Sequence, residues 1–329
     1  MELHTDVVAQ YADFARYAAG ESPCLEEWAL GVVADADVQA WIATLPGIKQ
    51  QPNLVFAAGR WHGVPAPGPY SGLRAALLAD ESAGGAIRAT IMARATQTNE
   101  VGRLATLTPV LAQVAAAAGR PLALLEVGPS AGLCLYPDRW SYDWSPLGVL
   151  SGPGPLLTCE ASGPMPVPDA LPEVAWRGGI DLHPLSVTDP DQMAWLANLV
   201  WPEQEDRRAR LQQAIAIAAA DPPYLVAGDL LEDLPDLVDQ ASSYGEVVVF
   251  HSAVLAYVED PGRRRFEDMM AGLVADGRCR WVSNEGKRVH PVVTATGPEI
   301  PDDQVAFVLG LDGRAVAWTR PHGASMRWL

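Results

Sequence analysis

The sequence carries little positive charge for its length. Its 23 lysines and arginines are outnumbered by 40 aspartates and glutamates, which gives the 329 residues a formal net charge of −17. A surface of this sign repels phosphate groups, so we expect neither nucleic acid nor an anionic membrane as a partner. The composition is typical of a soluble acidic protein.

Cysteines are scarce, and long apolar runs are absent. The four cysteines are scattered and form no Cys-x-x-Cys pair, which argues against a zinc site or a disulfide framework and fits a reducing cytoplasm. No run approaches the ~18 apolar residues of a membrane span. No basic and then apolar leader opens the chain, because Glu2 and Asp6 come first. We therefore expect a cytoplasmic protein without a bound metal.

Strand patterns are also missing from the first 98 residues. Apolar residues recur there at helical spacing, and capping residues, glycines and prolines separate the segments. The helices that this spacing predicts are residues 7–19, 26–33, 35–45, 53–61 and 73–79. We predict a helical N-terminal module over residues 1–98, which would either cover a ligand crevice or serve only for packing.

The stretch LALLEVGPSAG, from Leu122 to Gly132, organises the rest of the chain. Its four leading apolar residues predict a buried parallel strand, Glu126 stands at the strand's end, and Gly128 and Gly132 bracket a sharp turn. Such a turn aims the N-terminus of the next helix, with its unpaired N–H groups, at a ligand above the sheet. The stretch therefore predicts a strand, a turn and a ligand crevice.

Strand patterns alternate with helical patterns on both sides of this turn. The helical segments are residues 101–118, 189–201, 203–219 and 263–274, and the later strands are 174–181, 224–229, 246–258 and 278–286. Residues 305–318 predict a β-hairpin with Asp312 and Gly313 in its turn. This alternation predicts an α/β domain over residues 99–329, with a doubly wound, mostly parallel, Rossmann-like sheet and a C-terminal β-hairpin.

A segment rich in proline and glycine, residues 134–173, interrupts the alternation. A long loop of this kind within a compact domain is usually a lid or a covering excursion. Its aromatic side chains would either line a substrate pocket or pack within the insertion. They are Tyr136, Trp140, Tyr142 and Trp144.

Read as acid-x-Gly-x-x-x-Gly, the turn resembles the first motif of the S-adenosylmethionine-dependent methyltransferases. These enzymes begin their sheet at this motif, add four parallel strands and close with a hairpin, an order that the chain shares. The resemblance implies S-adenosylmethionine as the cofactor, with Glu126 facing its amino acid end and the Gly128 backbone lying against it. Ser130 stands where the motif has its middle glycine, and Gly132 completes the turn.

Acids after the next two strands extend the expected cofactor site. An acid after the second strand of such a sheet accepts hydrogen bonds from ribose hydroxyls. Asp181 is placed for this, with Asp143 as the rival. Asp229, followed by Leu230, resembles the methyltransferase acid that takes the adenine amino group.

Catalytic candidates stand at the ends of the last two parallel strands and at the start of the helix before the key strand. His251 ends an apolar run and is expected to point at the crevice, where the ordinary histidine pKa of about 6.5 suits a general base. The alternative is that it only bonds neighbouring backbone. Glu285, Asn99 and Glu100 are the next candidates, although Asn99 could simply cap its helix.

Residues 128–132 are also a Gly-x-Ser-x-Gly sequence, the nucleophile elbow of α/β-hydrolases. In that alternative Ser130 is the nucleophile. Its acid would be Asp229 or Asp236, and its base His251, His290 or His322. A hydrolase elbow normally follows several strands, whereas about 120 mostly helical residues precede Ser130, so the methyltransferase hypothesis is favoured. A non-catalytic ligand-binding protein on the same fold is the third hypothesis.

Several longer runs resemble a family of bacterial proteins known as a domain of unknown function and met often in actinobacteria. The runs are TNEVGR (98–103), LLEVGPSAGL (124–133), WRGGIDLHPL (176–185), VWPEQEDR (200–207) and VVFHSAVLAY (248–257). Together they span most of the chain. The resemblance implies little about activity, because a fold does not fix a function.

Overall fold

The computed structural model describes residues 6–82, 84–97 and 99–329, which form two compact units. The first unit comprises Met1–Thr98 together with Pro190–Gln212, and the second comprises Asn99–Asp189 together with Gln213–Leu329. The expected boundary after residue 98 coincides with the first of these divisions. The return of residues 190–212 to the helical unit has no counterpart in the sequence prediction.

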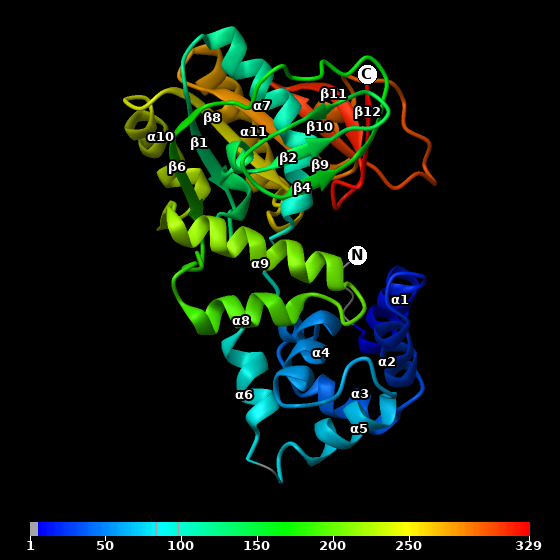
Figure 1. The fold of residues 1–329 in the computed structure, drawn as a ribbon. Coiled ribbons are helices and arrows are strands. Elements are labelled where there is room, and N and C mark those ends of the chain that lie inside the picture. Colours follow the sequence, from blue (N-terminus) through cyan, green and yellow to red (C-terminus); the bar gives the residue numbers. More distant parts are fainter. Residues whose placement is uncertain (1–5, 83, 98) are drawn as a thin grey trace. The chain divides into compact units, whose positions relative to one another are not determined.

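Helices make up the first unit, drawn from blue to cyan in Figure 1. They are α1 (Val7–Ala18), α2 (Pro23–Val33), α3 (Ala36–Ala43), α4 (Pro52–Trp61), α5 (Tyr70–Ala79) and α6 (Ala86–Ala93), with a 3₁₀ turn η1 (Gly47–Gln50). Ser22 and Asp35 cap α2 and α3 through their side-chain oxygens. The predicted helices are confirmed within a few residues, and α6 was not predicted.

Residues 190–212 join this unit through its aromatic core. They contain α8 (Pro190–Leu199) and the start of α9 (Glu205–Ala220). Trp195 and Trp201 are buried among the apolar side chains of α1 to α6. The Glu203 carboxylate accepts the backbone N–H of Cys24, and the Arg60 guanidinium donates to the Val200 carbonyl at 2.9 Å. The helical unit is therefore completed by a segment from far along the chain.

A large mixed sheet forms the centre of the second unit. Over the described residues its order is β5-β12-β11-β10-β9-β8-β1-β6-β7. The strands are β1 (Leu122–Val127), β5 (Glu160–Ser162), β6 (Val174–Asp181), β7 (Tyr224–Ala227), β8 (Glu246–Ser252), β9 (Arg280–Gly286), β10 (Phe307–Leu311), β11 (Arg314–Thr319) and β12 (Ser325–Trp328). The strands from β7 to β9 are parallel, whereas β10, β11 and β12 pair antiparallel. The predicted α/β class with a mostly parallel sheet is confirmed.

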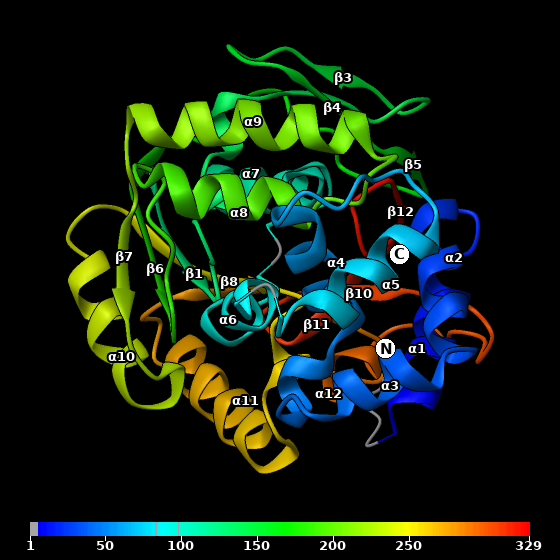
Figure 2. The same cartoon turned by 90° about the horizontal axis from the view of Figure 1, so that it is seen from below.

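Strand β1 lies in the middle of the parallel strands, and later strands were added on both sides of it. Strand β6 pairs with one of its edges and β8 with the other. Helices α10 (Leu230–Ala241) and α11 (Asp260–Ala275) cover one face, and α7 (Leu104–Ala118) covers the other (Figure 2). The carboxyl ends of β1 and β8 therefore meet at a topological switch point, where open α/β sheets bind ligands.

Helix α7 is a core helix. With the 3₁₀ turn η2 (Val101–Arg103) before it, it is the one described segment long and apolar enough to cross a membrane. Yet 67% of Val101–Ala118 is buried inside the protein, and the segment packs against the sheet. Gly119, at φ +62°, ends the helix as predicted.

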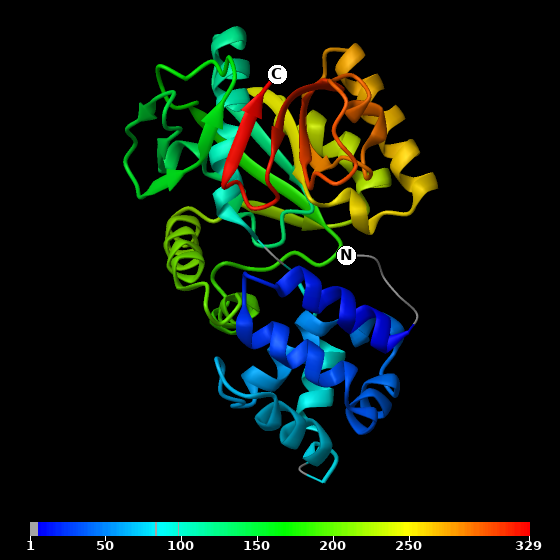
Figure 3. The same cartoon turned by 90° about the vertical axis from the view of Figure 1, so that its right-hand side faces the viewer.

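The insertion is folded rather than loop-like. Strands β2 (Ser141–Asp143), β3 (Val149–Leu150) and β4 (Leu156–Thr158) form a small separate sheet. Strand β5 then joins the main sheet beside β12, as the green and red strands of Figure 3 show. The insertion's four aromatic residues, Tyr136, Trp140, Tyr142 and Trp144, are at most 1% exposed. The rings of Tyr142 and Trp144 stack at 5.1 Å, so core packing, and not a pocket, is their role.

The helix expected directly after the glycine turn is absent from the described chain. Two short 3₁₀ turns, η3 (Leu133–Leu135) and η4 (Pro137–Arg139), follow instead. Pro137 disfavours a helical conformation in the residue before it and lacks an N–H donor, so the turn does not extend. The expected hairpin is confirmed as β10 and β11, with Asp312 and Gly313 at positive φ in its turn. The sequence patterns did not predict β12, which follows the hairpin, or η5 (Leu255–Tyr257) and α12 (Pro291–Thr294), which precede it.

Candidate functional site

Glu126 lies at the switch point, on the α7 side of the sheet. Successive side chains of a strand point to opposite faces. Ala123, Leu125 and Val127 pack in the core formed with α10 and α11. Glu126 therefore faces the other way, toward the segment that begins at Asn99.

The Glu126 carboxyl group is buried without a hydrogen bond among the described residues. The residue is 6% exposed, and its Oε2 has no hydrogen-bond partner among the described residues. Burial raises the pKa of this carboxyl well above its ordinary value; the Arg103 charge opposes the shift, and Asp181 adds to it. A buried carboxyl without a partner costs free energy, and such groups gather at functional sites.

The glycine turn above Glu126 has the expected backbone. Gly128, Ser130 and Gly132 lie at φ values of +66°, +53° and +71°. A Cβ atom at Gly128 would lie 2.7 Å from Val254, and one at Gly132 would lie 2.9 Å from Pro223. Both glycines are thus required by close packing of the protein's own side chains. The sequence interpretation, in which a ligand fills this space, differs from the structure here.

Ser130 combines backbone strain with an unpartnered hydroxyl. Its N–H donates to Asp181 Oδ2 at 2.9 Å, while its buried Oγ has no partner in the described chain. Ala253, just after β8, is a second non-glycine residue at positive φ, +60°. Both strained residues stand at the ends of neighbouring strands, and strain of this kind persists mainly at functional sites.

The segment before α7 lies against the same strand end. The Asn99 side chain donates to the Pro129 carbonyl, within the glycine turn. Glu100, which is 3% exposed, caps η2 by accepting the Gly102 N–H at 3.0 Å. The alternative that Asn99 caps this helix is therefore wrong, because Glu100 fills that position.

Arg103 and His322 complete this side of the site. The Arg103 guanidinium donates to the Ser252 carbonyl at the end of β8 and to the Pro321 carbonyl. His322 follows Pro321, and its Nδ1 lies 3.7 Å from Glu100 Oε2. The imidazole is 43% exposed while its carboxylate neighbour is buried. His322 was predicted only as a hydrolase base, because nothing in the sequence brings it to Glu100.

The acids expected to bind ribose and adenine serve the backbone in this structure. Asp181 accepts the N–H groups of Ser130 and His183, and Asp229 caps α10 through the Leu231 N–H. Leu230 packs against the core beneath α10. Asp143, the rival for the ribose, closes a turn in the small sheet by accepting two bonds from Ser145. No cluster of metal-ligating side chains occurs in the described ranges.

His251 does not point at the crevice. It shares a face of β8 with Val247 and Val249, which pack beneath α10 and α11, and it is 0% exposed. The Trp281 indole N–H donates to His251 Nε2 at 3.1 Å, and Nδ1 lies 2.7 Å from Glu285 Oε1. An indole can only donate, so Nε2 is the acceptor and Nδ1 carries the proton. This geometry favours a structural role for His251.

Glu285 fastens the loop after β8. Besides His251, its Oε1 accepts the N–H groups of Val254 and Leu255 at 2.9 and 3.2 Å. Val254 is the side chain that fills the space above Gly128. The two residues expected to act as bases thus support the glycine turn from beneath the sheet.

His290 belongs to the same buried layer. Its Nε2 lies 3.1 Å from Glu267 Oε1 without an aligned hydrogen bond. Burial, reinforced by the nearby His251 and opposed by Glu285, lowers the pKa of His290 to about 4.

No hydrolase triad is assembled around Ser130 in the part of the chain that the structure describes. Its Oγ has no hydrogen-bond partner, although a nucleophile needs a base within reach. His251 lies on the opposite face of the sheet, and Asp236 is exposed on α10. The short 3₁₀ turn after Gly132 also differs from the helix that follows a nucleophile elbow.

Comparison with family models identifies the family to which the chain belongs. A model described as an uncharacterized protein conserved in bacteria (DUF2332) matches residues 70–328, and the chain belongs to this family. The matched range takes in the whole glycine turn and the sheet around it. Comparisons with curated proteins and with solved structures give no match.

Proposed function

We propose that this family member is an S-adenosylmethionine-dependent methyltransferase of a small molecule, with the cofactor's amino acid end beside Glu126. The observation that carries the proposal is the buried, unpartnered carboxyl of Glu126 at the switch point. S-adenosylmethionine brings a cationic ammonium and a cationic sulfonium. Either charge would compensate this carboxylate, and charge-assisted hydrogen bonds are the strong ones.

The strand order supports a Rossmann-like methyltransferase arrangement. Parallel strands run from β7 to β9 with the first strand at the centre, and an antiparallel strand follows. Ser130 Oγ, buried and unpartnered in the glycine turn that follows the same strand, offers a donor and an acceptor. Asp181 already accepts two backbone N–H groups, but a carboxylate has about four acceptor positions, which leaves room for ribose hydroxyls.

The cofactor would supply an electrophilic methyl group, and the chain's residues would position and deprotonate the acceptor. His251 is sealed beneath the sheet, so its predicted role as base is not favoured. The half-exposed imidazole of His322, whose Nδ1 lies 3.7 Å from Glu100 Oε2, is accessible to an acceptor from solvent and can take up a proton. His322 is thus the base we favour, and Asn99 holds the glycine turn in place.

Calorimetric titration with S-adenosylmethionine and with its demethylated product tests the proposal. Because burial raises the Glu126 pKa and a cationic ligand favours the ionised carboxylate, binding should lower this pKa and so release protons. The measured heat should then depend on the ionisation enthalpy of the buffer. Glu126→Gln should weaken binding about tenfold or more. The matched control is Glu246→Gln, at the opposite end of β8.

Two outcomes would contradict the proposal. One is the absence of heat with either ligand at about millimolar concentration, where even weak ligands bind. The other is equal affinity in the wild type and in Glu126→Gln. Binding without transfer to any acceptor would instead favour a non-catalytic ligand-binding protein, which the sealed position of His251 also supports.

A further inference from the structure

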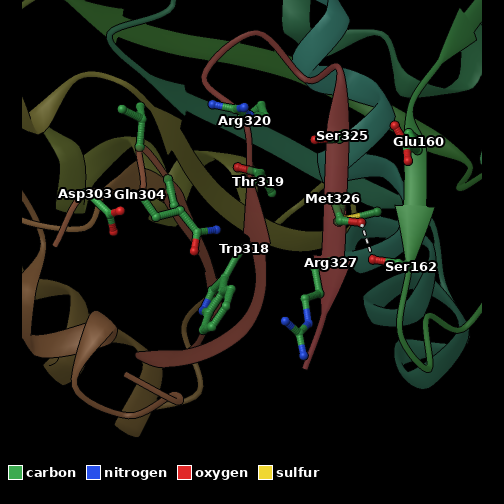
Figure 4. Close-up of a pocket in the computed structure, with 12 residues that line it drawn as sticks. Glu160, Ser162, Asp303, Gln304, Trp318, Thr319, Arg320, Ser325, Met326 and Arg327 are labelled. Atoms are coloured by element: carbon green, nitrogen blue, oxygen red, sulfur yellow. Dashed lines mark hydrogen bonds between the residues drawn. The ribbon is translucent and has the colours of Figure 1, made fainter. Parts of the chain in front are cut away.

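A pocket lies at one edge of the same sheet, away from Glu126. Its volume is about 400 Å³, and its walls come from β5, β11, β12 and the loop at residues 303–306. Figure 4 shows Glu160 and Asp303 on opposite sides, Arg320 toward one end, and Trp318 with Arg327 toward the other. The volume is within the range of about 300–1,000 Å³ usual for small-molecule sites.

The strand register gathers these side chains on one face. Trp318 stands opposite Arg327 across β11 and β12, and Arg327 stands opposite Ser162 across β12 and β5. Residue pairs that face each other across strands share a side of the sheet. The Arg327 guanidinium lies over the Trp318 ring, 5.3 Å from its centroid, and this cation–π contact orients it before any ligand arrives.

The pocket carries unpaired charges of both signs. In the described structure the side chains of Glu160, Asp303, Arg320 and Arg327 form no ion pair with one another or with any other residue. Arg280, on β9 of the same sheet, is instead paired with Asp312.

These charges restrict the chemical class of ligand that the pocket can bind. A phosphate ester would meet two carboxylates, and a simple amine would meet two guanidinium groups, so each would be repelled by half of the site. A molecule with one carboxylate and one ammonium satisfies both signs. The Trp318 ring and Val305 supply an apolar wall for its remainder. We propose that this pocket binds a free α-amino acid with an apolar or aromatic side chain.

Ligand-observed NMR with L-phenylalanine, L-tryptophan, L-leucine and L-methionine tests the proposal on the full chain. At least one should bind, and titration should show that removing its amino or its carboxylate group weakens binding about tenfold. Arg327→Gln and Glu160→Gln should each cause a loss of similar size. Arg314→Gln, an exposed arginine of β11 outside the pocket, should change nothing.

The test separates this site from the one at Glu126. Glu126→Gln should leave amino acid binding intact, and Arg327→Gln should leave S-adenosylmethionine binding intact. The proposal would be overturned if all four amino acids failed to bind at about 10 mM, a concentration at which even weak ligands bind. Binding that Arg327→Gln and Glu160→Gln leave unchanged, or equal binding of the deaminated form, would also overturn it.

Discussion

Glu126 shows at the scale of one residue how a binding group differs from a structural one. Asp181 and Glu285 are carboxylates of the same region, and each accepts backbone N–H groups that it helps to order. Glu126 has no such bonds and is nevertheless buried. The charge of Arg103 opposes the cost of burying this carboxyl, but no hydrogen bond among the described residues does, and a group that lowers stability in this way is typical of ligand sites.

We predict that Glu126→Gln stabilises the ligand-free protein at neutral pH. The Glu126 pKa is higher in the folded than in the unfolded chain. Its contribution to the free energy of unfolding is therefore full at acidic pH and is lost as the pH rises toward the raised pKa. The amide cannot ionise and escapes this loss, which should raise the free energy of unfolding at pH 7 by about 1 kcal/mol or more.

Urea denaturation of both proteins between pH 5 and 9 measures this difference, because the range starts near the ordinary carboxyl pKa and extends in the direction of the raised one. Glu246→Gln, which alters a partly exposed carboxylate of β8, is the control. A variant less stable than the wild type at every pH would mean that Glu126 has a structural partner.

His290 gives a pH dependence of the opposite sign. Its folded-state pKa of about 4 lies below the ordinary histidine value, so the unfolded chain takes up a proton more readily. Stability should be full above about pH 6.5 and decline as the pH falls toward 4, by up to about 3 kcal/mol. His290→Gln should flatten this decline in thermal melts, whereas His183→Gln, an exposed site, should not.

At the scale of elements, the loop after β8 depends on one carboxylate. Glu285 Oε1 receives donors from His251, Val254 and Leu255, and losing it would leave three buried or half-buried N–H groups without their acceptor. We expect Glu285→Ala to destabilise the protein by about 3 kcal/mol or more. Hydrogen exchange at the amides of Val254 and Leu255 should accelerate, while exchange in β11 should stay unchanged. Unaltered exchange at both amides would show that the loop is held by other contacts.

Several elements could be predicted because their sequence patterns are strong. The apolar run of β1, the glycines around it and the Asp-Gly turn of the hairpin each determine a local structure. Strands β5 and β12 span only 3 and 4 residues, too few for a pattern, and β5 lies in a segment dominated by proline and glycine. Their pairing depends on contacts between distant parts of the chain.

The site was predictable in position but not in detail. An acid and a glycine turn after the first strand locate the crevice. The run before His251 is apolar on both faces, however, so no alternation reveals which face the histidine occupies. The approach of His322 to Glu100 joins residues more than 200 positions apart, and only the folded chain brings them together.

At the scale of the whole molecule, the helical unit extends beyond residue 98 to include residues 190–212. Its core includes Trp195 and Trp201, and the latter ring lies 5.7 Å from Phe14. We predict that a fragment of residues 1–98 lacks cooperative unfolding, because it loses two large buried aromatic side chains. Fusing residues 190–212 to it through a flexible linker should restore cooperativity. A sharp thermal transition in the 1–98 fragment alone would contradict this.

The pairing of β12 with β5 also bears on how the protein is made. Ser162 donates to the Met326 carbonyl across 164 positions of sequence, so one edge of the sheet stays open until the ribosome has released residues 325–328. Until then the growing chain exposes the unpaired edges of both β5 and β11, the kind of surface through which nascent chains associate. Slow translation after β11 should therefore make the protein dependent on chaperones, although β1 and the strands beside it have already been synthesised.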